Sequence, residues 1–152
     1  MKRRLLLFSA IAMAMFLGIT AVSYYRFWVF NDASLALKTG DYGQAMRLLR
    51  PWAAVGDSKA QYILGELYAF GLGVAKDDEI AVYWYRRAGQ IGPAEPSDES
   101  ASDPAASAMY YVGKRYQEGT GVKRDEGEAR KWFERSAKGG FAKAREELKR
   151  AR

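Results

Sequence analysis

Hydrophobic residues recur three and four positions apart through most of the chain, and this spacing predicts an all-α protein. Glycines and aspartates stand between the periodic segments, where they can end one helix and begin the next. The segments expected to be helical are residues 33–39, 58–70, 78–90, 105–118 and 126–138, with further helices from Asp41 and from about residue 141. Asn31 or Asp32 can cap the first of these segments, and Gly40 stops it. Pro51 predicts a kink or a break near Arg50, because proline lacks an N–H donor and its ring clashes with the preceding turn.

The positions of small and aromatic residues repeat along the chain. Ten residues, Ala60, Leu64, Gly65, Tyr68, Gly71, Gly73, Asp77, Ala81, Trp84 and Ala88, are matched 48 positions later by Ala108, Val112, Gly113, Tyr116, Gly119, Gly121, Asp125, Ala129, Trp132 and Ser136. A partial copy lies 36 positions before the first one, since Asp41 and Ala45 precede Asp77 and Ala81 by that spacing. Self-similarity at this period predicts stacked helical repeats, which usually present a surface for binding instead of a catalytic pocket.

Each repeated residue type has a physical role in a helix pair. Gly65 and Ala81 are small, so two antiparallel helices can approach closely at these positions. Gly71 and Gly73 bracket a tight turn, where glycine adopts positive φ angles without a Cβ penalty. Asp77 is expected to accept hydrogen bonds from the free N–H groups at the start of the following helix.

These residues resemble the Sel1-like repeat, a relative of the tetratricopeptide repeat, over roughly residues 41–144. The resemblance implies a short α/α solenoid that acts as an adaptor or scaffold for other proteins, and it implies no enzyme chemistry by itself. The domain bounds expected are residues 1–30 for an N-terminal membrane segment, 31–56 for a partial repeat, 57–92 and 105–140 for the full repeats, 93–104 for an insertion, and 141–152 for a capping helix.

By its relation to tetratricopeptide repeats, the resemblance also implies that the first helix of each pair lines a concave groove. The residues that this alignment places toward the groove are Lys59, Tyr62, Glu66, Ala69, Ser107, Tyr110, Lys114 and Gln117. We expect Tyr62 and Tyr110 to face outward and to contact a partner peptide, because tyrosine offers a large contact area with a polar tip. The alternative is that so short a stack binds through its edges or through the insertion.

The N-terminal segment has the length and character of a transmembrane helix. Three basic residues precede an uncharged run from Leu5 to Tyr25, and the 18 residues from Leu5 to Val22 would span about 27 Å as a helix. These 18 residues are followed by aromatic residues that favour a membrane interface, Tyr24, Tyr25, Phe27, Trp28 and Phe30. The charge distribution predicts a cytoplasmic N-terminus and repeats on the periplasmic side of a bacterial inner membrane.

The same segment is compatible with a cleaved signal peptide, which would leave a soluble periplasmic protein. The best cleavage candidate, Ile19-Thr20-Ala21, has a bulky residue where a small one is preferred, and cleavage there would expose the aromatic residues at a new N-terminus. We therefore favour an uncleaved anchor, with the membrane contacted through residues 5–30.

Composition narrows the chemistry that the chain can perform. The chain has no cysteine and no histidine, which excludes disulfides, thiol catalysis, Cys/His zinc sites and a histidine base. Residues 1–30 hold four basic and no acidic residues, so the remainder has 20 basic against 18 acidic residues and gives no electrostatic case for nucleic acid. We expect no cofactor, no metal and no small-molecule substrate.

Two further segments are interpreted as structural. Residues 93–104 are rich in proline and acidic residues and predict a mobile surface loop. Phe141, Ala144 and Leu148 share one face of the C-terminal segment, as expected for a capping helix. The functional prediction is a membrane-anchored module that binds unidentified protein partners. The alternative is an exported envelope hydrolase or glycan-active enzyme that uses carboxylates only, for which no pair of acids outside helix caps is visible.

Overall fold

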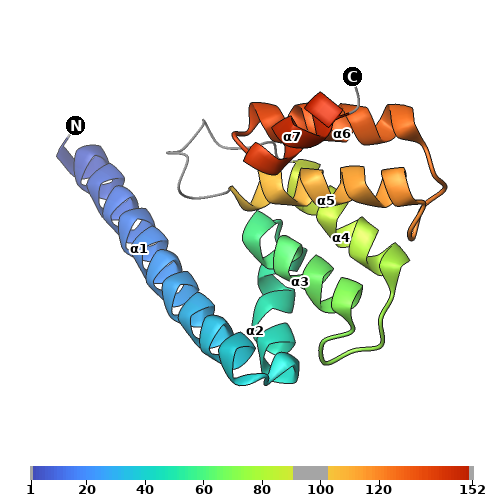
Figure 1. Ribbon diagram of the computed structural model, residues 1–152. Helices are drawn as coiled ribbons and strands as arrows, with labels where there is room; N and C mark the ends of the chain where they lie inside the picture. Colours follow the sequence, from blue (N-terminus) through green and yellow to red (C-terminus); the bar gives the residue numbers. More distant parts are fainter. Residues whose placement is uncertain (1, 91–102, 151–152) are drawn as a thin grey trace.

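The computed structural model describes residues 2–90 and 103–150, with side chains from Gly18 onward, and the regular secondary structure of these residues is entirely helical. The helices are α1 (Lys2–Thr39), α2 (Tyr42–Ala54), α3 (Ser58–Phe70), α4 (Asp78–Gln90), α5 (Pro104–Glu118), α6 (Glu126–Lys138) and α7 (Ala142–Arg150). Successive helices pack against one another as a stack, and the N-terminal half of α1 projects away from it (Figure 1). The predicted helix pairs of both full repeats are therefore confirmed.

The N-terminal helix is longer than predicted. We expected a separate short helix from Ala33, capped by Asn31 or Asp32, and this expectation is wrong, because α1 continues without a break to Thr39. No proline lies in this segment to interrupt its hydrogen bonds, and Gly40, at φ 79°, ends the helix as predicted. The last turns of α1 join the stack through Val29, Ala33 and Ala36, which are buried.

Pro51 does not break α2, which continues through it to Ala54. Proline in the last turn withholds a single N–H, from the carbonyl four residues earlier, and the following N–H groups still find partners. The N–H of Val55 donates to the carbonyl oxygen of Pro51 at 3.2 Å, and the N–H of Asp57 donates to that of Trp52 at 3.0 Å. Of the kink or break predicted near Arg50, the break is therefore wrong.

Each full repeat is closed by an aromatic ring that lies on a glycine. A Cβ atom on Gly65 would lie 2.6 Å from two ring carbons of Tyr85, and one on Gly113 would lie 2.6 Å from a ring carbon of Phe133. Both distances are far below van der Waals contact, so no side chain fits between the helices at these positions. The close approach predicted from the small residues is confirmed, and the ring that exploits it comes from the second helix of the pair.

The turn between the two helices of a repeat packs on the preceding repeat. Gly73 has a positive φ of 70°, and a Cβ atom on it would lie 2.7 Å from Cβ of Tyr42 at the start of α2. Gly121 has the same φ and lies against the backbone of Asp78 at the start of α4. This second glycine of the turn is therefore required by its backbone conformation and also by the contact between repeats.

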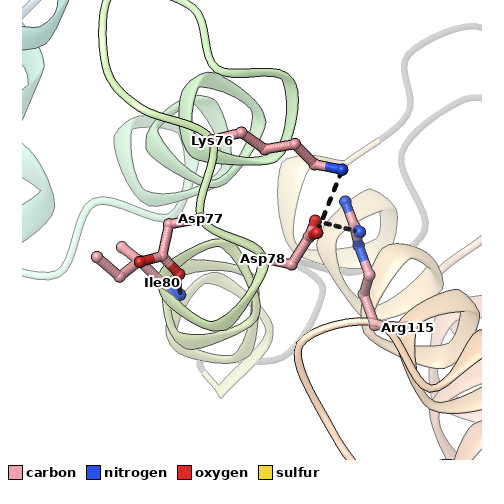
Figure 2. Close-up of polar contacts among 5 residues, drawn as sticks. All are labelled: Lys76, Asp77, Asp78, Ile80 and Arg115. Carbon is pink, nitrogen blue, oxygen red and sulfur yellow. Dashed lines mark hydrogen bonds and ion pairs between the residues drawn. The ribbon is translucent and has the colours of Figure 1, made fainter.

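Aspartate side chains begin five of the helices. The predicted caps at Asp41, Asp77 and Asp125 accept hydrogen bonds from N–H groups three residues later, each at 2.9 Å. Asp57 caps α3 in the same way, and Asp103 caps α5, and neither cap was predicted from the sequence. Figure 2 shows the Asp77 cap beside Asp78, whose carboxylate points in a different direction.

Polar side chains also connect neighbouring repeats. The guanidinium of Arg50 donates to the hydroxyl of Tyr68 at 3.2 Å, and Arg86 makes the equivalent bond to Tyr116. Asp78 on α4 pairs with Arg115 on α5, with 2.5 Å between the carboxylate and guanidinium atoms (Figure 2). Neighbouring repeats are therefore held together by hydrogen bonds and an ion pair in addition to apolar packing.

The C-terminal helix closes the stack, as predicted. Ala144 is fully buried against Ala129 and Phe133 of α6, with Phe141 and Leu148 packed around it. The insertion predicted at 93–104 lies outside the described residues except for its last two positions, where Asp103 caps α5 and Pro104 is its first residue.

Candidate functional site

One face of α3 carries three of the predicted groove residues, Lys59, Tyr62 and Glu66. They lie three and seven positions apart and therefore share one side of the helix. We call these three residues the α3 strip. It lies between α1 and α5, because Lys59 contacts Phe30 of α1 and Tyr62 contacts Tyr111 of α5.

At its N-terminal end, the α3 strip borders a cavity of about 310 Å³ between α3 and α1. Arg26, Phe30 and Asn31 of α1 and Lys59 of α3 are among the residues that line it. The ammonium of Lys59 lies 5.3 Å from the centre of the Phe30 ring, and the guanidinium of Arg26 lies 5.1 Å from it. Arg26 is paired with Asp57 at 2.7 Å, whereas Lys59 has no carboxylate within 4.0 Å among the described residues.

At the centre of the α3 strip, three tyrosines from three helices pack together. The ring centres of Tyr62, Tyr85 and Tyr111 are 5.4 to 6.0 Å apart. Tyr85 forms the floor of this cluster and is fully buried, and its hydroxyl has no hydrogen-bond partner among the described residues. Tyr62 and Tyr111 are half-buried and form the accessible part of the cluster.

Glu66 lies one helical turn beyond Tyr62 and is tied to it. The Tyr62 hydroxyl donates a hydrogen bond to Oε1 of Glu66 at 2.7 Å. Burial raises the pKa of the Glu66 carboxyl above its ordinary value of 4.5, and the Tyr62 hydrogen bond opposes part of that rise. In the described part of the chain, no lysine or arginine lies within 4.0 Å of this carboxylate, so its charge is not neutralised by an ion pair.

The second-copy residues are placed differently from those of the α3 strip. Ser107 is buried, with 5 % of its surface exposed. Lys114 donates to Gln117 at 2.8 Å and pairs with two carboxylates, Glu118 at 3.3 Å and Glu147 of α7 at 3.9 Å. The polar groups of Lys114 and Gln117, which were expected to face a partner, are therefore bound within the chain.

Four of the predicted groove residues are less exposed than expected. Ala69 is 4 % exposed and packs against Ala81 and Tyr85, so it belongs to the core, as Ser107 does. Tyr110 was expected to face outward, but its ring lies 5.1 Å from Phe141 of the terminal helix and 5.7 Å from Phe133. Tyr62 is half-buried for the related reason that its ring packs on Tyr85 and Tyr111.

Tyr111 and Phe30 border the α3 strip and were not predicted from the sequence. Tyr111 occupies the position that corresponds to Ile63 in the first repeat, and the replacement of an aliphatic residue by a polar-tipped ring was the available signal. Phe30 was interpreted only as part of the aromatic segment after the membrane run. No repeat spacing connects it to α3, so its contact with Lys59 could not be inferred.

The middle of α1 exposes a series of large apolar side chains. The exposed ones are Ile19, Val22, Tyr24, Tyr25, Phe27, Trp28 and Leu35, of which Tyr24 has 74 % of its surface free. Among the residues whose side chains are described, 18–90 and 103–150, no helix is both long and apolar enough to cross a membrane. The predicted span from Leu5 to Val22 falls largely outside these residues.

Several acidic residues within the described part of the chain are already engaged in structural contacts. Asp77 and Asp125 are occupied as helix caps, and Asp78 is held by Arg115 and by Lys76 at 3.2 Å. No group of three potential metal ligands occurs within residues 18–90 and 103–150. Glu66 lies among tyrosines, and Tyr62 donates to its carboxylate, whereas a carboxylate-only hydrolase needs two acids in one cleft, so that alternative stays a prediction.

Comparison with known proteins identifies the repeats. Residues 58–93 and 106–141 match the Sel1 repeat, and these segments contain the two helix pairs α3–α4 and α5–α6 apart from the first residues of α5. The chain therefore carries two Sel1 repeats, as the resemblance of its motifs implied. A comparison with curated proteins found no match.

Solved structures agree with this assignment. A Sel1 repeat protein from Oxalobacter formigenes is 33 % identical, with a TM-score of 0.66, over 77 % of this chain and 43 % of its own length. The protein c5321 from uropathogenic Escherichia coli, a protective antigen with an SLR fold, is 36 % identical, with a TM-score of 0.57, over 66 % of this chain and 19 % of its own length. Helicobacter pylori cysteine rich protein B shares the fold at 22 % identity and a TM-score of 0.57, over 67 % of this chain and 68 % of its own.

The chain thus spans less than half the length of the first two relatives. The fold is an all-helical solenoid of the Sel1 type, and proteins built from such repeats generally mediate interactions between proteins. Sel1 repeat proteins are typically scaffolds without enzyme activity.

Proposed function

We propose that the chain is a membrane-tethered adaptor that binds a protein partner through the α3 strip. The observation that carries the proposal is that both charged residues of α3 lack an ion pair. Neither Lys59 nor Glu66 has an oppositely charged partner in the described part of the chain. A helix that needed its charges only for solubility would gain from pairing them locally, as α5 and α6 do.

The tether in this proposal is α1, in a bacterial inner membrane, with its N-terminus cytoplasmic and the repeats periplasmic. Two observations support it. The sequence from Leu5 to Tyr25 is uncharged, and the exposed aromatic residues at its end and just beyond it, such as Tyr24 and Trp28, are of the kind that favours a membrane interface. The repeats would then be held a short distance from the membrane surface.

Carbonate extraction and protease protection test the tether. We expect the full-length chain to stay in carbonate-washed membranes, and we expect external protease to reach the repeats only after the outer membrane is opened. Recovery of a soluble form that begins near Val22 would show instead that the segment is a cleaved signal peptide.

Site-specific photo-crosslinking in cells tests the binding surface. A photoreactive amino acid at position 59, on the α3 strip, is compared with one at position 131, where the Lys131 side chain is 70 % exposed on α6. We expect a discrete adduct at position 59 and none at position 131. Equal adducts at both positions, or an adduct at position 131 alone, would place the contact surface elsewhere.

A further inference from the structure

The α3 strip presents two isolated charges of opposite sign on one side of a helix. Lys59 and Glu66 are seven residues apart, which is two helical turns and about 10 Å along the axis. Each charge is held near aromatic rings, Lys59 by Phe30 and Glu66 by Tyr62. The rings limit the positions that the two side chains can adopt, so the distance between the two charges is largely fixed.

The surroundings of Glu66 favour a cation as its partner. A carboxylate that loses water on burial regains the lost energy only when an opposite charge or several donors reach it, and here Tyr62 is its one donor among the described residues. The half-buried rings of Tyr62 and Tyr111 stand on the accessible side of the tyrosine cluster. An ammonium or guanidinium group placed there would lie beside both the carboxylate and the accessible parts of these rings.

The surroundings of Lys59 favour an anion. The cavity beside it contains a second cation, Arg26, and the side chain of Asn31, and no acidic residue lines it. Asp57 already neutralises Arg26 at 2.7 Å, so the uncompensated charge at this end is that of Lys59. A carboxylate entering the cavity would find an ammonium and an amide donor beside the apolar Phe30 ring.

We propose that the α3 strip binds an extended peptide segment of a partner protein that carries a basic residue opposite Glu66 and an acidic residue opposite Lys59. This inference rests on the proposed adaptor function and adds the chemistry of the partner. The distance of about 10 Å corresponds to three residues of an extended chain, and in a polyproline II conformation residues three apart also lie on the same side. The recognised pattern is therefore one basic and one acidic residue about three positions apart, in a fixed order along α3.

A peptide-selection experiment tests the inference. Random short peptides displayed on phage are selected on the full-length chain in detergent micelles, and in parallel on the variants Glu66→Gln, Lys59→Gln and Glu134→Gln. Glu134 is the matched control, because it is a partly exposed glutamate on α6, away from the α3 strip. Thermal melting by circular dichroism checks that each variant is folded.

We expect the wild type and Glu134→Gln to enrich peptides with a basic and an acidic residue about three positions apart. Glu66→Gln should remove the preference for the basic residue and Lys59→Gln the preference for the acidic one. Each of these variants should bind a wild-type-selected peptide about tenfold more weakly, as expected for loss of a charge-assisted hydrogen bond.

Other outcomes separate this inference from the function on which it rests. Enriched peptides without the charge pair, or with an affinity unchanged by Glu66→Gln, would overturn the inference and leave the adaptor function standing. Failure to enrich any peptide would count against both. A concentration-dependent dimer that Glu66→Gln dissociates, measured by light scattering, would show that a second copy of the chain occupies the α3 strip and would also overturn the inference.

Discussion

The first helices of the two full repeats, α3 and α5, are equivalent in their packing and different in their charges. Both carry a glycine under an aromatic ring, and both carry a tyrosine whose hydroxyl accepts from an arginine of the preceding repeat. On α5, however, Lys114, Arg115 and Glu118 all take part in ion pairs, whereas Lys59 and Glu66 of α3 do not. The repeated residues thus specify the same packing in both copies. The copies differ in their charges, and the unpaired charges of α3 are therefore the candidate for function.

The largest expected effect on stability comes from the glycine packing that α3 and α5 share. Gly65→Leu and Gly113→Leu should each lower the free energy of unfolding by about 3 kcal/mol, because a side chain there must displace the ring of Tyr85 or Phe133. Chemical denaturation of the purified chain measures both. Gly43→Ala is the control, since its new Cβ atom would make only ordinary contacts at 3.7 Å. A much smaller loss at one of the two glycines would show that the repeats are not packed alike.

The next effect concerns the tyrosines, for which the sequence predicted exposure. Tyr62→Ala and Tyr110→Ala should each cost about 2 kcal/mol of stability, because both half-buried rings pack on other rings. Tyr62→Phe should cost about 1 kcal/mol, less than Tyr62→Ala, because the ring packing stays and only the hydrogen bond to Glu66 is removed. Thermal and chemical denaturation distinguish these cases, and an alanine variant as stable as the wild type would restore the original expectation of an outward tyrosine.

The sequence predicted the packing well and the surface poorly, and these variants show why. Gly71 and Asp77 have roles defined by their own backbone, and Gly65 meets a ring of its own repeat, so spacing within one repeat was enough to assign all three. The exposure of Tyr110 depends on its contact with Phe141, which immediately precedes α7, and the surroundings of Lys59 depend on Phe30 of α1. Neither α7 nor α1 belongs to a full repeat, so the repeat spacing could not predict these contacts. Surfaces formed by residues distant in sequence could not be derived from the repeat alone.

A smaller effect compares a paired charge with an unpaired one. Asp78→Asn should cost about 1 to 2 kcal/mol, because it leaves the partly buried Arg115 guanidinium without a carboxylate and loosens the junction between the two repeats (Figure 2). Glu66→Gln should cost nothing at neutral pH, since no ion pair is lost and the amide oxygen still accepts from Tyr62. Urea unfolding of the two variants under identical conditions makes the comparison. A loss at Glu66→Gln equal to that at Asp78→Asn would mean that Glu66 has a structural role.

The smallest effect is the pH dependence that Glu66 contributes. Because burial raises its pKa in the folded state, the folded chain binds this proton more tightly than the unfolded chain does. The resulting stabilisation is fully present below pH 4.5, the ordinary pKa, and it is lost as the pH rises through the raised value. Glutamine does not titrate, so Glu66→Gln should gain stability relative to the wild type across this window. A difference that does not change with pH, measured by unfolding at a series of pH values, would contradict the burial of the carboxyl.

The central claim, that the unpaired charges of α3 form the binding surface, is tested most directly by exchanging them. The double variant Lys59→Glu/Glu66→Lys keeps both charges and reverses their order along the helix. Fluorescence polarisation measures the affinity of this variant and of the wild type for one wild-type-selected peptide and for the same peptide with its basic and acidic residues exchanged. We predict that each protein prefers the peptide whose charges match its own order, by about tenfold or more. If both proteins prefer the same peptide, the charges of α3 do not contact the partner and the account is wrong.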